Sequence, residues 1–146
     1  MESNDLNRFL SAQEPCFKGV VEELSAGRKR SHWIWFIFPQ RTGLGTSYNA
    51  QYYGLKNDAE IDAYINHEIL GPRYFQCTSI VHSWLVTNGA KPNVLMGSSI
   101  DSMKLRSSLG TFVFACSSME PKSEQICQFL HEAEEIAKEL GWDYVP

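Results

Sequence analysis

Apolar residues recur every three or four positions near the C-terminal end of the chain, and this spacing restricts what the segment can form. The positions are Ile126, Phe129, Leu130, Ala133, Ile136, Ala137 and Leu140. Side chains at that spacing share one face of an α-helix, and Gly141 follows where a helix commonly ends. We therefore predict an amphipathic helix over residues 126–140, with its many acidic residues on a solvated outer face.

The same criterion predicts helices through most of the remaining chain. A long helix starts near Pro72, and another starts with Asp101 as its N-cap. A shorter helix follows the capping-box pair Asn57 and Glu60. Two further short helices are expected in the N-terminal part, where Pro15 separates them.

Residues 33–38 are the one segment that resembles a strand, because they are aromatic, partly β-branched and followed by Pro39. So short an apolar run fits a buried helical turn equally well. The predicted fold is therefore mainly α. We expect a single compact helical domain over residues 1–146, with about five or six helices and at most a short buried strand.

The composition narrows the class of protein. A hydrophobic fraction of 43% suffices for one core without disulfides, so the 4 widely spaced cysteines are expected to be free and mostly buried. The net charge of −4 argues against general nucleic-acid binding. The histidines lack metal-ligand spacing, and we expect neither a metal nor a cofactor. No signal pattern or membrane-length apolar run is present, so we expect a cytoplasmic protein with no membrane partner.

Residues 27–40 (GRKRSHWIWFIFPQ) place cations directly against a run of apolar residues. The apolar part must be buried, which gives the flanking polar side chains a rigid support. A cation beside an aromatic face suits a phosphate joined to a flat ring. We therefore predict ligand contacts from Lys29, Arg30, Trp33 and Gln40, with His32 as a proton donor or acceptor. The alternative is a plain core flanked by solvated cations and a structural histidine, and the sequence leaves both readings open.

A second polar cluster lies on the helix predicted to start at Asp101. Lys104, Ser107 and Ser108 follow at helical spacing, and we predict that they also contact the ligand. The amino end of this helix offers backbone N–H groups suited to an anion. Asp101 is one of several carboxylates that could stabilise the transition state of hydrolysis at a sugar C1 atom. The alternative is a simple N-cap followed by a solvated, serine-rich face.

Taken together, several segments resemble the family known as domain of unknown function 1810. They are residues 27–40, the Gly43-Leu-Gly45 turn, residues 67–73 (HEILGPR) and residues 101–108 (DSMKLRSS). The resemblance covers nearly the whole chain and implies a compact, mainly helical domain without an established activity. Two loops depart from the family pattern, with Glu68 in place of a proline and Met96 in place of an aromatic residue.

The family is in turn distantly similar to the NADAR group, whose name refers to NAD and ADP-ribose and whose activities include N-glycosidic cleavage. This similarity implies that the ligand is a phosphorylated nucleoside or an ADP-ribose- or NAD-like molecule. It also implies hydrolysis of the N-glycosidic bond, for which Asp101 and His32 are the candidate catalytic residues. The chain has no obvious counterpart of that group's glutamate-histidine-tyrosine signature, so catalysis stays open.

The alternative function is a non-catalytic interaction domain that docks an acidic or phosphorylated protein partner. It predicts that Trp33 or Trp35 is exposed in a continuous apolar patch instead of lining a concave pocket. Neither hypothesis predicts an oligomeric state.

Overall fold

Helices make up the regular structure of residues 5–146, the part of the chain that this computed structural model describes. They are α1 (Asn7–Gln13), α2 (Phe17–Ser25), α3 (Ile34–Ile37), α4 (Tyr48–Tyr52), α5 (Asp58–Asn66), α6 (Leu70–His82), the π-helical turn η1 (Ser83–Thr87), α7 (Pro92–Leu95), α8 (Ser99–Ser117) and α9 (Glu124–Leu140). The mainly α prediction is confirmed. The predicted number of about five or six is wrong, since nine α-helices occur in the described chain.

The helices missing from the prediction are the shortest ones, α3, α4 and α7, which have 4 or 5 residues each. A single turn contains too few residues to show a period. The α3 helix lies within residues 33–38, the segment that resembles a strand in the sequence. Ile34 and Ile37 are 1% and 3% exposed, and only a helical turn brings residues three apart onto one buried face.

Side-chain caps set the ends of the longer helices. Asn57 accepts the N–H of Glu60 at 2.8 Å at the start of α5, as predicted. Ser98, not Asp101, caps α8, because its hydroxyl accepts the N–H of Asp101 at 3.0 Å. The predicted N-cap was therefore wrong. Serine followed three residues later by an acidic residue is itself a capping pattern, so the sequence did contain the correct signal.

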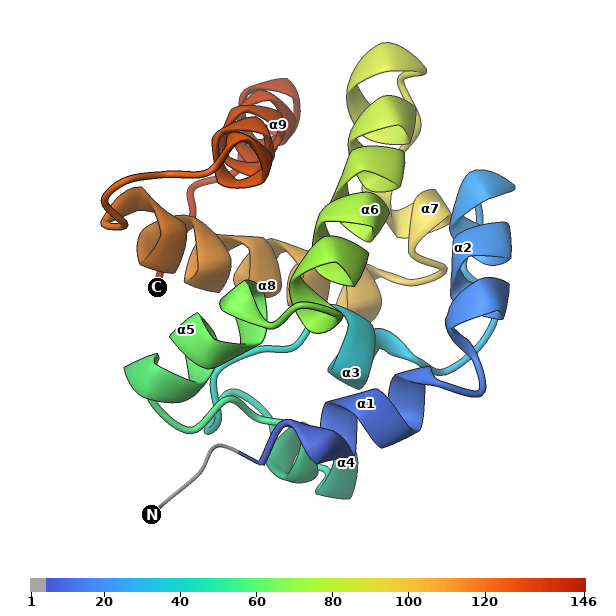
Figure 1. The fold of residues 1–146 in the computed structure, drawn as a ribbon. Helices are drawn as coiled ribbons and strands as arrows, with labels where there is room; N and C mark the ends of the chain where they lie inside the picture. The colour runs from blue at the N-terminus through green and yellow to red at the C-terminus, as the bar shows by residue number, and fades with distance from the viewer. Residues whose placement is uncertain (1–4) are drawn as a thin grey trace.

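Two central helices, α6 and α8, organise the domain. The α6 helix packs against α2, α5 and α9, whereas α8 packs against α3, α5, α7 and α9. In Figure 1, α6 and α9 stand side by side above α8. The aromatic rings of Tyr74 on α6 and Phe112 on α8 meet in the core, with centroids 4.6 Å apart. The α8 helix is therefore in contact with other helices on several sides.

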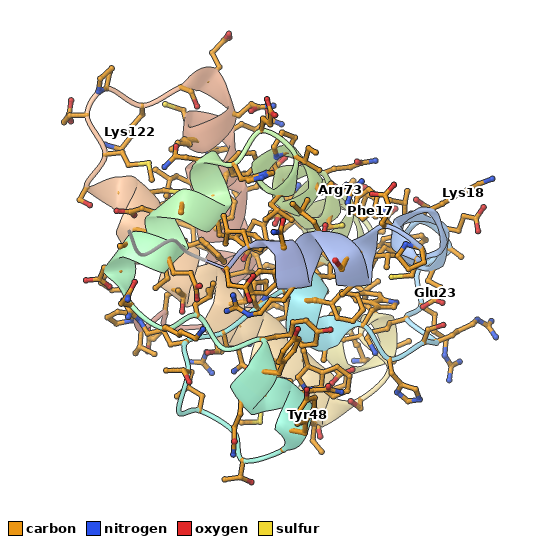
Figure 2. The ribbon with its side chains drawn as sticks, turned by 60° about the horizontal axis from the view of Figure 1, so that its bottom comes forward. Phe17, Lys18, Glu23, Tyr48, Arg73 and Lys122 are labelled. Atoms are coloured by element: carbon orange, nitrogen blue, oxygen red, sulfur yellow. The ribbon has the colours of Figure 1, made fainter. Side chains whose placement is uncertain are left out.

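The segment 67–73, which carries part of the family resemblance, has a structural role. His67 Nδ1 accepts the N–H groups of Ile69 and Leu70 at 3.0 and 3.2 Å and so caps α6. The guanidinium of Arg73 lies 4.8 Å from the centroid of the Phe17 ring, where α6 meets α2 (Figure 2). This segment fixes the position of α6 and contributes no residue to the cleft between the basic loop 28–33 and α8.

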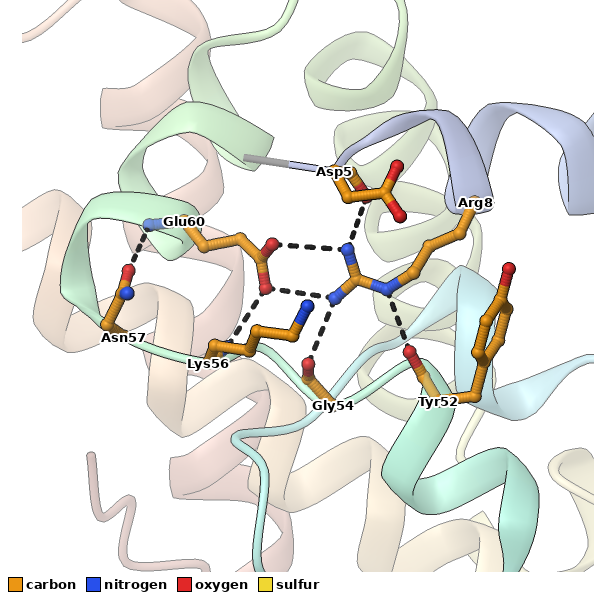
Figure 3. Close-up of polar contacts among 7 residues, drawn as sticks. All are labelled: Asp5, Arg8, Tyr52, Gly54, Lys56, Asn57 and Glu60. Carbon is orange, nitrogen blue, oxygen red and sulfur yellow. Dashed lines mark hydrogen bonds and ion pairs between the residues drawn. The ribbon is translucent and has the colours of Figure 1, made fainter. Parts of the chain in front are cut away.

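A buried ion pair connects α1 to α5 (Figure 3). The side chains of Arg8 and Glu60 are each 2% exposed, and their charged atoms meet at 2.9 and 3.1 Å. The remaining N–H groups of Arg8 donate to the carbonyl oxygens of Asp5, Tyr52 and Gly54. The pair therefore also holds the segment that leads from α4 into α5.

The 4 cysteines of the sequence are free thiols. Cys77 and Cys116 are buried and Cys16 is partly buried, but Cys127 is exposed, so the expectation of burial fails there. None of the helices in residues 5–146 combines the length and the apolar character needed to cross a membrane. In the same range no three His, Cys, Asp or Glu side chains gather into a possible metal-ligand set.

Candidate functional site

The basic loop 28–33 is held in place by the carboxylate of Glu23 on α2. Glu23 accepts the N–H groups of Arg30 and Ser31 at 2.8 and 3.0 Å, the Ser31 hydroxyl at 2.5 Å and the indole N–H of Trp33 at 2.9 Å. Burial alone would raise the pKa of Glu23, but these hydrogen bonds outweigh it and lower the pKa from 4.5 to about 2. The loop is therefore a fixed support for its charged side chains.

Lys29 joins this loop to the start of α8. Its ammonium lies 2.7 Å from Asp101 Oδ2 and donates to the carbonyl oxygen of Ser31 at 2.5 Å. The side chains of Lys29 and Asp101 are 5% and 17% exposed, so the pair is only partly open to solvent. The backbone N–H of Lys29 also donates to the carbonyl oxygen of Leu95 at 2.7 Å. Two sequence segments that were predicted separately as site segments thus form one structure.

Gly97 allows the two segments to approach this closely. Its φ is 85°, which residues with a side chain rarely adopt, and a Cβ at this position would lie 2.9 Å from the carbonyl oxygen of Lys29. Glycine is therefore required here for two independent reasons, the backbone conformation and the contact.

An open cleft of about 290 Å³ lies between the loop and the start of α8. Its polar and aromatic lining consists of Lys29, Arg30, His32, Trp35, Ser98 and Asp101. The structure therefore brings together four predicted site residues from distant parts of the sequence. A volume of this size is at the lower end of the range typical of small-molecule sites.

Lys104 lies at the edge of the cleft, with its ammonium 5.0 Å from the centroid of the Trp35 ring. Trp35 was not predicted as a contact residue, whereas Trp33 was. Trp33 is 2% exposed and lies beneath the Lys29 ammonium, so the structure corrects this assignment. The alternation that would put both indoles on one face applies to a strand. In the observed helical turn, one indole enters the core and the other reaches the cleft.

Three other predicted contact residues lie outside the cleft, which is a further correction. Gln40 lines a smaller neighbouring hollow of about 10 Å³, which shares Trp35 with the cleft and has room for about one water molecule. Ser108 is completely buried and shares a hydrogen bond of 2.9 Å with the hydroxyl of Tyr74. Ser107 is partly buried, and its carbonyl oxygen accepts the Thr111 hydroxyl. The predicted polar stripe of α8 is therefore divided, since Ser108 bonds to Tyr74 of α6 while Lys104 lies at the edge of the cleft.

The charges of the cleft favour an anion. The Lys29–Asp101 pair is neutral as a unit, and the exposed guanidinium of Arg30 then adds a positive charge. Lys104 adds a second one at the edge. The first two N–H groups of α8 have no acceptor within the helix, and Ser98, Ile100 and Asp101 at this helix start line the cleft, so the positive end of the helix dipole lies beside it. Arg30 and these N–H groups could therefore hold a phosphate.

The interaction-domain alternative depends on an exposed tryptophan. Neither Trp33 nor Trp35 belongs to the exposed large apolar side chains of the described residues. Trp35 instead lines the concave surface of the cleft. Exposed apolar side chains do occur nearby on α8, where Ile100 and Met103 are 63% and 70% exposed.

Fold and site together define a helical domain in which a carboxylate-anchored basic loop and a helix start enclose a polar cleft. The chain belongs to the family described as protein of unknown function (DUF1810), whose model matches residues 3–139. The family membership expected from the sequence is confirmed.

The fold is similar to the crystal structure of the conserved hypothetical protein Rv1873 from Mycobacterium tuberculosis. The two sequences are 36% identical, the TM-score is 0.82, and the match covers 98% of this chain and 92% of that chain. No curated protein matches the chain. The distant similarity to the NADAR group is not tested by these comparisons and stays a prediction.

Proposed function

We propose that the cleft binds a small phosphorylated molecule that carries a planar ring, of the phosphorylated nucleoside or ADP-ribose class. The observation that carries this proposal is the convergence of Arg30, His32 and the Lys29–Asp101 pair beside Trp35 at the start of α8. Lys29, Arg30, His32 and Trp35 come from one segment of the sequence, whereas Asp101 comes from the start of α8, far along the chain. Their meeting in one concave site favours recognition of a ligand over a solvated charge cluster.

In the proposed complex the two ends of the ligand meet different chemistry. The phosphate accepts charge-assisted hydrogen bonds from Arg30 and from the first N–H groups of α8. The planar ring lies against Trp35, the aromatic side chain of the lining. The Lys29–Asp101 pair forms the floor between them, where its low exposure restricts the access of water.

The proposal extends to hydrolysis of the N-glycosidic bond of the ligand. Water adds to the sugar C1 atom and loses a proton while the bond from C1 to the ring nitrogen breaks. A neutral base such as adenine takes up a proton as it leaves, whereas the cationic nicotinamide ring of NAD leaves as neutral nicotinamide without one. Asp101 pairs with Lys29 through Oδ2, and its Oδ1 makes no hydrogen bond with the described residues. That oxygen stabilises positive charge at C1, orients the water and accepts its proton, and His32 donates a proton to a leaving base such as adenine that needs one.

Calorimetry with AMP, ADP-ribose and NAD tests the binding part, with adenosine as the ligand that lacks a phosphate. Replacing Arg30 by alanine should weaken ADP-ribose binding at least about tenfold, because a hydrogen bond to a charged group contributes about 1.5–3 kcal/mol. Arg28→Ala is the matched control, since Arg28 is an exposed cation of the same basic run that is absent from the lining. The proposal fails if none of the phosphorylated ligands binds, or if both variants weaken binding equally.

The catalytic part is tested separately by incubating the protein with NAD and measuring free nicotinamide by chromatography. Asp101→Asn should abolish nicotinamide release while NAD still binds, and binding should become somewhat tighter because a negative charge has left an anion site. If the unmodified protein releases no nicotinamide from NAD that it demonstrably binds, the catalytic part is refuted and the binding part stands.

A further inference from the structure

A second cleft, of about 220 Å³, lies between α6 and α9 and shares no lining residue with the first. The α6 helix contributes Phe75, Gln76 and Ser79, and α9 contributes Gln128, Phe129 and Glu132. Both sets have the same spacing along their helices, so each forms a compact patch on one face and the two patches look toward each other. The chemistry of the cleft is set mainly by one carboxylate.

Glu132 is a buried carboxylate whose charge has no counter-ion in residues 5–146. The residue is 8% exposed, which contradicts the prediction that the acidic residues of α9 are solvated. Its oxygens accept the Ser79 hydroxyl at 2.8 and 3.0 Å and the side-chain amide of Gln128 at 3.1 Å. These donors are neutral, and a buried charge normally has a partner of opposite charge. Glu135, one turn further on, instead meets the imidazole of His82 at 2.7 Å.

The rest of the lining also suits a positive charge. The rings of Phe75 and Phe129 lie with centroids 5.6 Å apart, and aromatic faces attract cations. Gln128 uses its amide N–H on Glu132, which leaves its amide oxygen as an acceptor. Gln76 adds a second amide to the lining. No lysine, arginine or histidine lines this cleft in the described chain, so acceptors converge on a space that lacks charged donors.

We propose that the cleft between α6 and α9 binds a small organic cation, a primary ammonium or guanidinium compound, with Glu132 as its counter-ion. The charged nitrogen donates hydrogen bonds to Glu132 and to the amide oxygen of Gln128. The apolar part of the ligand packs against Phe75 and Phe129. A volume of 220 Å³ corresponds to roughly seven water molecules, which suits a molecule of the size of benzylamine.

Isothermal titration of the full chain with benzylamine, and separately with benzyl alcohol, tests the role of the charge. The two probes have nearly the same shape, and only benzylamine is cationic at neutral pH. Benzylamine should bind at least about tenfold more tightly than benzyl alcohol. Glu132→Gln keeps the size and the acceptor oxygen but removes the charge, and it should abolish this difference. Glu139→Gln, which removes a charge from an exposed position of the same helix, should leave it unchanged.

Nuclear magnetic resonance of the unmodified protein locates the site without depending on the folding of a variant. Benzylamine should shift the side-chain amide signals of Gln76 and Gln128, which line the cleft, and leave that of Gln51 in place, which lies on α4. The proposal is overturned if benzylamine and benzyl alcohol bind equally, if neither binds, or if the amide signals of Gln76 and Gln128 do not move. Binding of ADP-ribose at the first cleft plays no part in these results.

Discussion

Two ion pairs of the described chain, Arg8–Glu60 and Lys29–Asp101, are similarly buried and differ in what their atoms have left to bind. Arg8 and Glu60 are each 2% exposed, and Lys29 and Asp101 are 5% and 17% exposed. Each pair connects segments that are far apart in the sequence. One of them lies in a closed network, whereas the other lines a cleft of about 290 Å³.

In the Arg8–Glu60 pair, the N–H groups of the arginine and both carboxylate oxygens of the glutamate all form hydrogen bonds. Each of the five N–H groups of Arg8 has an acceptor, and Glu60 also accepts the backbone N–H of Lys56 at 2.9 Å. Burial alone would raise the pKa of Glu60, but the hydrogen bonds from Arg8 and Lys56 lower it below its usual value. Asp101, by contrast, keeps one carboxylate oxygen directed at no described residue. The candidate site is therefore distinguished by a carboxylate oxygen that is free to bind beside a cleft. Burial of charge does not distinguish it, because both pairs are buried.

The largest effect on stability is expected when the Arg8–Glu60 pair is broken. Arg8→Ala leaves Glu60 buried without its partner and should lower the free energy of unfolding by about 3–5 kcal/mol. Urea denaturation measures this, with Arg41→Ala as the control. Arg41 also forms an ion pair at 2.8 Å, but its partner Asp58 is 85% exposed, so its loss should cost less than about 1 kcal/mol. Equal costs for the two variants would show that the closed network does not stabilise the fold as inferred.

How far the sequence predicts this fold depends on helix length. The α9 helix was predicted because seven apolar positions repeat its period, and α8 was predicted with its start misplaced. The α3 helix was not predicted, because one turn has no period and its aromatic residues also suit a strand. Tertiary packing, which the sequence does not state, decided between the two.

The same limit applies to the two clefts. Lys29, Arg30 and His32, which line the first cleft, were predicted because charge beside a buried run is visible in the sequence. Asp101 was predicted because it is a carboxylate at an expected helix start. Trp35 was missed because its direction depends on whether the segment is helix or strand. Glu132 was missed because it looks like its acidic neighbours on α9, and only the packing of α6 against it makes it buried. Helix-to-helix packing is the information that was lacking.

An intermediate effect is expected at Gly97, which allows the loop that carries Lys29 to approach the start of α8. Gly97→Ala and Gly43→Ala both place a side chain at a positive φ, of 85° and 91°. A Cβ at Gly97 meets the Lys29 carbonyl oxygen at 2.9 Å, whereas nothing lies within 4 Å at Gly43. Gly97→Ala should therefore cost about 2 kcal/mol more than Gly43→Ala, since overpacking costs about 1–3 kcal/mol.

Urea denaturation of both glycine variants measures the difference, and calorimetry with ADP-ribose adds a second readout. Because the loop is displaced from α8, Gly97→Ala should also weaken binding of ADP-ribose, and Gly43→Ala should not. If the two alanine variants are equally stable, the close approach between residues 95–97 and the loop does not contribute as the structure indicates.

The smallest effect is expected at Glu23, which holds the basic loop 28–33 that carries Lys29. Glu23→Gln keeps the shape and most hydrogen bonds but removes the charge, and it should cost about 1 kcal/mol at neutral pH because the site is partly exposed. The pKa of Glu23 is lowered from 4.5 to about 2, so its contribution is fully present above about pH 4.5 and is lost as the pH falls toward 2. The stability difference between the unmodified protein and Glu23→Gln should therefore shrink over this range. The pKa of Glu60 is lowered as well, but Glu60 is present in both proteins, so its contribution cancels in the difference.

Glu22→Gln is the control, because Glu22 is an exposed neighbour of Glu23. This variant should show no such pH-dependent difference from the unmodified protein. If the difference between the unmodified protein and Glu23→Gln stays constant down to pH 2, the carboxylate of Glu23 does not anchor the loop through its charge.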